Sequence, residues 1–155
     1  MWNSTAGGML PPVATRATGA RGGPLIGYVA AALGGALGSL ARWGLGLALP
    51  HPAGAWPTAT LLVNLTGCLL LGLLVAALFA RHPGSPWLRP FLGTGVLGGW
   101  TTFSTFAVDA VQLADAGRGG AAVGYVLVSV VGGVLAAAAG VRLGRAVPPP
   151  REPGR

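Results

Sequence analysis

Residues 98–106 read GGWTTFSTF and form the densest group of polar side chains in any hydrophobic stretch of the chain. Two adjacent glycines weaken a helix, and the neighbouring hydroxyl side chains can hydrogen-bond to backbone groups that a break releases. Carbonyl oxygens freed at such a break can hold a cation. Phe103 and Phe106 share one face of a resumed helix, where they either pack or present their positive ring edges to an anion. The run therefore predicts a helix break with a cation site and an anion route.

Further polar side chains interrupt the other hydrophobic stretches, where each costs a few kcal/mol in lipid and needs a reason. Arg42, in GGALGSLARW, either reaches the membrane interface or forms an electropositive mouth for anions. Asn64, in LLVNLTG, either bonds two helices together or replaces part of an anion's hydration shell. Tyr125 and Ser129 lie one turn apart and either pack or extend a polar track.

The elements that must position these residues are hydrophobic helices. The 155 residues are 52% hydrophobic and only 8% charged, with a mean hydropathy of +0.66, which excludes an ordinary soluble domain. Four stretches are long enough to cross a bilayer, at about residues 25–49, 58–80, 90–113 and 120–143. Backbone groups in hydrocarbon need internal partners, so these stretches are expected to be helices. The prediction is an all-α integral membrane protein with four transmembrane helices, the third of them broken.

This organisation implies one membrane domain at residues 25–144, between a flexible tail at 1–24 and a disordered tail at 145–155. All ten basic residues are arginines, dispersed rather than gathered in a stripe, which argues against nucleic-acid binding. Four membrane crossings put both tails and the second connection on one side of the membrane. The first and third connections lie on the opposite side, which carries Arg118 alone. The other side carries Arg16, Arg21, Arg81, Arg89, Arg142, Arg145, Arg151 and Arg155. The positive-inside rule then places both termini in the cytoplasm.

Three residues that often bind metals offer no site in this sequence. Cys68 is the only cysteine and lies in a hydrophobic stretch, so no intrachain disulfide and no cysteine cluster are possible. His51 and His82 fall in two different loops, where we expect them to be solvated.

The segments GGALGSLARW, WPTATLLVNLTG and GVLGGWTTFSTF occur in this order on three successive predicted helices. Together they resemble the CrcB/Fluc family of fluoride channels over about residues 25–143. The resemblance implies passive export of fluoride across the cell membrane, and no enzymatic activity. It also implies a dual-topology dimer in which two four-helix subunits pack antiparallel in the lipid bilayer.

The resemblance also assigns roles to residues. It implies a structural Na⁺ ion, not transported, held by the backbone carbonyls of Gly98 and Thr101. It places Arg42 in an aqueous vestibule. The implied fluoride path is formed by Asn64, Phe103, Ser104, Thr105, Phe106, Tyr125 and Ser129.

The sequence departs from the family pattern in three ways. Val131 and Gly133 replace hydroxyl residues expected farther along the polar track, and Asp109 stands where members often have Glu. The arginine count, eight against one, also differs from the balanced charge of a subunit that inserts in both orientations. The predicted partner is therefore either a second copy or an oppositely oriented paralogue.

Two other functions fit a small four-helix membrane protein. A small multidrug resistance exporter depends on a carboxylate in its first helix, whereas the first hydrophobic stretch here has Arg42 and no acidic residue. A non-conducting partner subunit of a heteromeric channel would use the polar residues only to bond helices. A nucleotide-driven pump is not expected, because the pattern GxxxxGK[ST] is absent.

Overall fold

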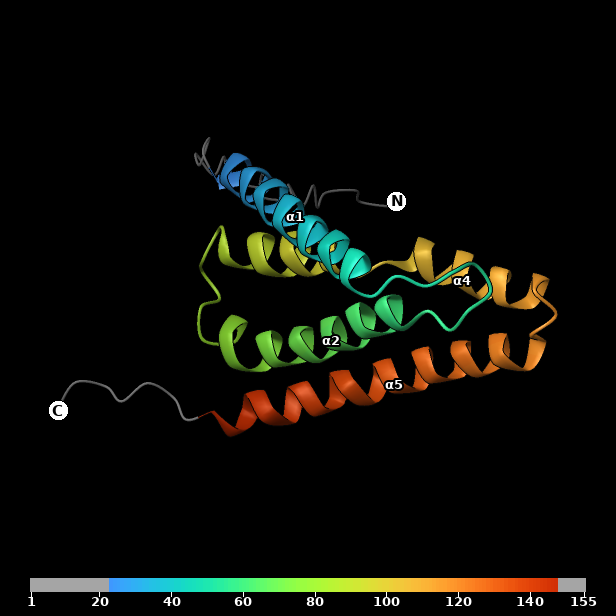
Figure 1. Ribbon diagram of the computed structural model, residues 1–155. Coiled ribbons are helices and arrows are strands. Elements are labelled where there is room, and N and C mark those ends of the chain that lie inside the picture. The colour runs from blue at the N-terminus through green and yellow to red at the C-terminus, as the bar shows by residue number, and fades with distance from the viewer. Residues whose placement is uncertain (1–22, 148–155) are drawn as a thin grey trace, which may run out of the picture.

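The computed structural model describes residues 23–147, and within them all regular structure is helical (Figure 1). The helices in chain order are α1 (Gly23–Ala48), α2 (Thr58–Leu74), the π-helical η1 (Val75–Phe79) and η2 (Arg89–Leu97), α3 (Gly98–Trp100), α4 (Phe103–Asp115) and α5 (Gly119–Ala146). Of the tails predicted at residues 1–24 and 145–155, the parts at 1–22 and 148–155 lie outside the described residues, whereas residues 23–24 and 145–146 are helical. Helix α1 begins two residues earlier, and α5 ends three residues later, than the sequence predicted.

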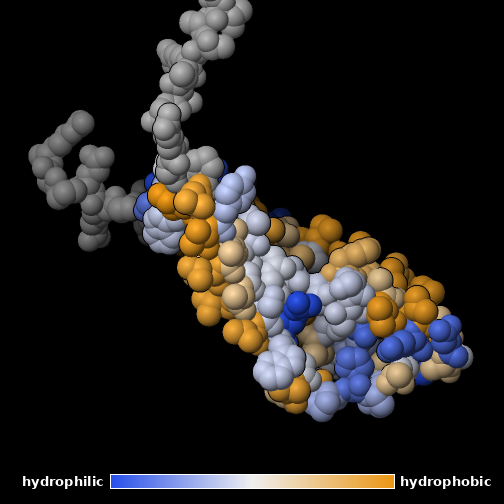
Figure 2. All heavy atoms as spheres, turned by 90° about the horizontal axis from the view of Figure 1, so that it is seen from above, coloured by the Kyte–Doolittle hydropathy of each residue, from blue (hydrophilic) through white to orange (hydrophobic). Residues whose placement is uncertain are grey.

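Three helices in the described part of the chain are long and apolar enough to cross a membrane: Leu25–Ala48, Thr58–Phe79 and Gly119–Ala146. Their large apolar side chains are mostly exposed, as lipid contact requires. Figure 2 shows apolar atoms along the flanks of the molecule and hydrophilic atoms gathered toward the end away from the grey segments. The chain is an all-helical, multi-pass membrane protein.

The third predicted helix is divided into two parts, η2 with α3 and then α4, so it does not count among those three. The break lies at Thr101 and Thr102, both of which have extended backbones. The sequence associated the break with Gly98 and Gly99, but both glycines are helical. The structure therefore moves the break three residues toward the C-terminus.

The helices pack closely in two groups. One group is α1 with η2 and α3, and the other is α2 with α5 (Figure 1). On α1, a Cβ atom at Gly34 or Gly38 would collide with backbone atoms of η2. On α5, a Cβ at Gly140 or Gly144 would collide with the backbone of α2 or its π-helical extension. The helices therefore pack through small residues, which let their backbones approach closely.

The connection between α1 and α2 is fixed against the far end of α4 and the start of α5. The Arg118 guanidinium donates a 2.8 Å hydrogen bond to the carbonyl oxygen of Gly54. Gly54 has φ +77°, a left-handed backbone conformation that favours glycine, and a Cβ there would strike Ala116. Trp56 lies edge-on against Tyr125, with ring centroids 5.8 Å apart. This end of the molecule therefore has a defined loop above the α4–α5 pair.

Candidate functional site

A side chain of α2 holds the broken helix by its backbone. Nδ2 of Asn64 donates to the carbonyl oxygen of Thr102 at 3.0 Å, and Oδ1 of Asn64 accepts from the Thr102 amide at 2.9 Å. One amide group thus satisfies both backbone groups of an extended residue. Of the two roles that the sequence left open for Asn64, the structure shows the bond between helices. One Nδ2 hydrogen remains for a second acceptor.

The same break releases backbone carbonyl oxygens, among them those of Gly98 and Thr101. In a continuous α-helix the Thr102 amide would donate to Gly98, and the Thr105 amide would donate to Thr101. Here the first donates to Asn64, and the second donates to Thr102 Oγ1 at 3.2 Å. The Gly98 and Thr101 carbonyls therefore lose their usual partners, and Gly98 faces open space. Uncharged backbone oxygens of this kind suit a hard cation such as Na⁺.

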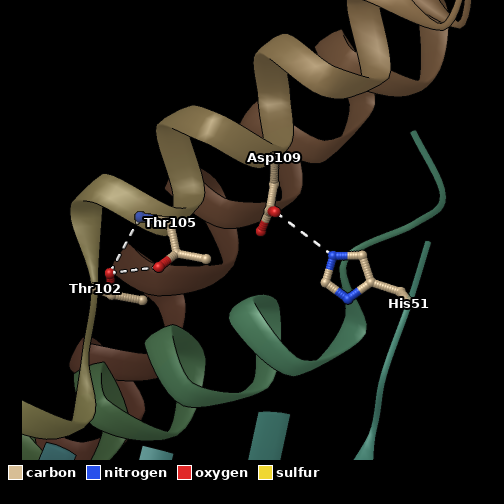
Figure 3. Close-up of polar contacts among 4 residues, drawn as sticks. All are labelled: His51, Thr102, Thr105 and Asp109. Atoms are coloured by element: carbon tan, nitrogen blue, oxygen red, sulfur yellow. Dashed lines mark hydrogen bonds and ion pairs between the residues drawn. The ribbon is translucent and has the colours of Figure 1, made fainter. Parts of the chain in front are cut away.

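Thr102 caps the resumed helix. Its Oγ1 accepts from the Thr105 amide and donates to Thr105 Oγ1 at 3.0 Å (Figure 3), while Ser104 Oγ lies 3.3 Å away. Thr102 is buried, with 8% of its surface exposed. The sequence analysis did not assign Thr102 a site role. Its position one residue before a helix start, three residues before Thr105, is the capping signal that would have identified it.

Three of the predicted aromatic residues form a row. Phe103 and Phe106 have ring centroids 5.8 Å apart, and Phe106 lies 5.3 Å from Tyr125. Phe103 is 81% exposed, whereas Tyr125 is fully buried. Both phenylalanines line a cavity of about 450 Å³ together with Asn64 and Ser129. Four predicted path residues therefore line one cavity: Asn64, Phe103, Phe106 and Ser129. Tyr125 does not line this cavity but packs against Phe106.

A second cavity, of about 500 Å³, lies between α1 and the break. Arg42 lines it, and the Arg42 Nε atom is buried with no hydrogen-bond partner among residues 23–147. Thr60 and Thr105 supply hydroxyl groups to the same cavity. Thr102 borders both cavities, so the Asn64–Thr102 bond lies where the two meet. The predicted Arg42 vestibule and the predicted path residues therefore adjoin.

His51 also lines the second cavity, which corrects the expectation that it is simply a solvated loop residue. Its Nε2 lies 3.5 Å from Oδ1 of Asp109, a carboxylate that is only 6% exposed (Figure 3). His82 is exposed, as expected. The sequence offered one signal for Asp109, its position one turn after Thr105 on the same helix face.

Comparison with known proteins decides the family. The family model described as "CrcB-like protein, Camphor Resistance (CrcB)" matches residues 29–141. This chain belongs to the CrcB family. The matched range contains every predicted site residue of this CrcB protein, from Arg42 to Ser129.

Similar CrcB relatives carry the name fluoride-specific ion channel FluC. The chain is 48% identical to the protein of Paracoccus denitrificans over 118 residues, which are 76% of this chain and 94% of the relative. It is 46% identical to the Chloroflexus aurantiacus protein over 118 residues, again 76% of this chain and 94% of the relative. FluC 2 of Geobacillus kaustophilus is 44% identical over 115 residues, 73% of this chain and 88% of that protein.

Thr102→Val tests the cap in this CrcB protein. The substitution keeps the side-chain volume but removes Oγ1, so we expect a loss of about 1 kcal/mol of stability and faster hydrogen exchange at the Thr105 amide. Thr102→Ser keeps the hydroxyl group, so it should keep the wild-type stability and the wild-type exchange rate at the Thr105 amide. Thr94→Val, at an exposed position on η2, is the matched control. Equal exchange rates in Thr102→Val and Thr94→Val would contradict the cap.

Proposed function

We propose that this CrcB protein is a fluoride-specific ion channel that lets fluoride leave the cytoplasm passively and so lowers fluoride toxicity. The observation that carries the proposal is the helix break between two cavities, one lined by Arg42 and the other by Phe103 and Phe106. The names of the relatives support it. An anion enters from the first cavity, passes the Asn64–Thr102 bond, and continues along the phenylalanine rings.

The chemistry of the route suits a small, strongly hydrated anion. The unbonded Nδ2 hydrogen of Asn64 and the hydroxyls of Ser104 and Thr105 are compact donors that can replace water molecules one at a time. The positive edges of the aromatic rings attract an anion without a full charge that would trap it. Arg42 raises the local fluoride concentration at the entrance. Wider anions find fewer donors within reach, which gives selectivity.

The direct test is efflux from liposomes that contain the purified protein, alone or together with an oppositely oriented partner subunit, loaded first with fluoride and then with chloride. We expect rapid fluoride release and no chloride release. Asn64→Ala and Phe103→Ile should slow fluoride release by at least about tenfold, which corresponds to roughly 1.4 kcal/mol of added barrier. Leu143→Ile, at an exposed apolar position outside both cavities, is the control and should conduct as the wild type does.

Each alternative function predicts a different result. A small multidrug resistance exporter would move organic cations in exchange for protons and leave fluoride inside. A non-conducting subunit would release neither ion, whether alone or together with a partner subunit. Release of fluoride and chloride at similar rates would contradict the selectivity assigned to Asn64 and the phenylalanine rings.

The proposed channel is an antiparallel dimer of two subunits that each cross the bilayer four times. Phe103 is 81% exposed beside the break, and Gly98 faces open space, so the proposed route lacks a wall that a second subunit would supply. The partner is a second copy or an oppositely oriented paralogue, and the arginine bias of eight against one favours the paralogue.

The orientation of the chain distinguishes these partners. Expressed alone and labelled at both termini, the protein should insert with both termini in the cytoplasm, because the arginines are concentrated on that side. It should then conduct fully only together with an oppositely oriented subunit. A roughly equal mixture of orientations, with full fluoride conduction by this chain alone, would contradict the heteromeric pair.

The proposed dimer holds one structural Na⁺ ion on the Gly98 and Thr101 carbonyls of each subunit. The freed carbonyl oxygens described above support this assignment, and when bound the ion would supply a central positive charge that joins the subunits. Both residues act through their backbones, so the Thr101 side chain is replaceable.

Thermal stability tests the sodium site without measuring conduction. The purified protein should unfold at higher temperature in Na⁺ than in N-methylglucamine at equal ionic strength, because binding to the folded state alone stabilises it. Thr101→Ser keeps the backbone carbonyl and should keep this sodium-dependent shift. An unfolding temperature independent of the cation would contradict the site.

A further inference from the structure

We propose that His51 sets the rate of fluoride conduction by balancing the charge of Asp109 beside the cavity that Arg42 lines. The inference rests on the proposed function and adds a positioning residue from the loop between α1 and α2. Its basis is the ion pair between Nε2 of His51 and Oδ1 of Asp109, at 3.5 Å.

The pair lies close to the proposed anion route. Thr105 lines the cavity one turn before Asp109 on α4, and His51 lines it from the loop. Figure 3 shows the side chains of Thr105 and Asp109 on one side of α4, with the imidazole ring facing the carboxylate. Asp109 is 6% exposed, so little water screens its charge. An uncompensated carboxylate at this place would repel fluoride from the cavity.

The loop that carries His51 is fixed a few residues further on. The Arg118 hydrogen bond holds it at the left-handed residue Gly54, and the edge-on contact of Trp56 with Tyr125 holds it just after. The His51 side chain is 24% exposed, which leaves it open to protons from water while it faces Asp109. The loop therefore presents a titratable group to a buried carboxylate in a defined geometry.

The other charged and titratable groups around the pair do not replace His51. Arg42 lines the same cavity from α1, but the structure has no ion pair between Arg42 and Asp109. Arg118 bonds to the loop backbone, and Tyr125 approaches from α5 as a neutral phenol. Within residues 23–147, Asp109 Oδ2 has no hydrogen-bond partner. Helix α2 contributes the uncharged Thr60 to this cavity.

The pair gives conduction a pH dependence of defined sign. Imidazole is the side chain whose charge ordinarily changes between pH 5 and 8. Protonated His51 makes the pair neutral, whereas unprotonated His51 leaves the net charge of the Asp109 carboxylate beside the route. Fluoride conduction should therefore increase as the pH falls through this range.

The test compares fluoride efflux from liposomes held at equal pH on both sides, at several values between about pH 6 and 8, within the range in which the charge of imidazole ordinarily changes. His51→Gln should reduce efflux severalfold near pH 6 and abolish the pH dependence. His51→Arg, which stays protonated, should keep high efflux at every pH. His51→Gln combined with Asp109→Asn should restore efflux, since the charge to be balanced is gone. His82→Gln, at the exposed loop histidine, is the matched control, and protein-free liposomes measure leakage of hydrogen fluoride.

The outcomes separate this inference from the function on which it rests. A wild-type protein that releases no fluoride, either alone or together with an oppositely oriented partner subunit, would overturn both. A wild type that conducts fluoride, together with His51→Gln showing the same rates and the same pH profile, would overturn the role of His51 alone. Failure of Asp109→Asn to restore efflux in the His51→Gln protein would overturn it as well. Should His51→Gln not fold, a pH profile of His51→Arg identical to that of the wild type would decide the matter in the same way.

Discussion

The hydrogen bonds between Asn64 and the backbone of Thr102 are the interaction on which the site depends. A helix that breaks within hydrocarbon must find new partners for the backbone groups that it releases, because lipid offers none. Asn64 supplies a donor and an acceptor at once. An aspartate would offer the acceptor alone, and a leucine would offer neither. The identity of this α2 residue therefore follows from the need to satisfy both groups of one extended residue.

The helix break has two consequences for the backbone, one for the amides that follow it and one for the carbonyl oxygens that precede it. The Thr102 amide and the Thr105 amide are diverted to side-chain oxygens, so the carbonyl oxygens of Gly98 and Thr101 lose their helical donors. The resumed helix begins with its positive end beside the cavities, among the hydroxyls of Thr102, Ser104 and Thr105. A single change in backbone direction thus separates groups that suit a cation from groups that suit an anion, within a few residues of one chain.

Local patterns predicted the helices, their contacts and the presence of a break, while tertiary contacts decided the rest. Gly34 and Gly38 were predictable as a packing pair because residues four apart share a helix face. Gly99 was taken as a sign of weakness, yet it is helical, and a Cβ there would collide with the Gly35 carbonyl on α1. Its small size is needed for packing and not for flexibility. The pairing of His51 with Asp109 joins a loop to α4, and no spacing rule connects residues so far apart in sequence.

The net charge beside the route depends on which basic side chain pairs with the buried carboxylate of Asp109. Asp109 is paired with His51 from the loop, and Arg42 on α1 is not part of that ion pair. Had Arg42 bound Asp109, the cavity would be permanently neutral, because arginine does not lose its proton in proteins. With His51 as the partner, Arg42 is not part of the pair, and its positive charge stays available to attract an anion. The loop between α1 and α2 is therefore part of the electrostatics of the route, although it contributes nothing to the break itself.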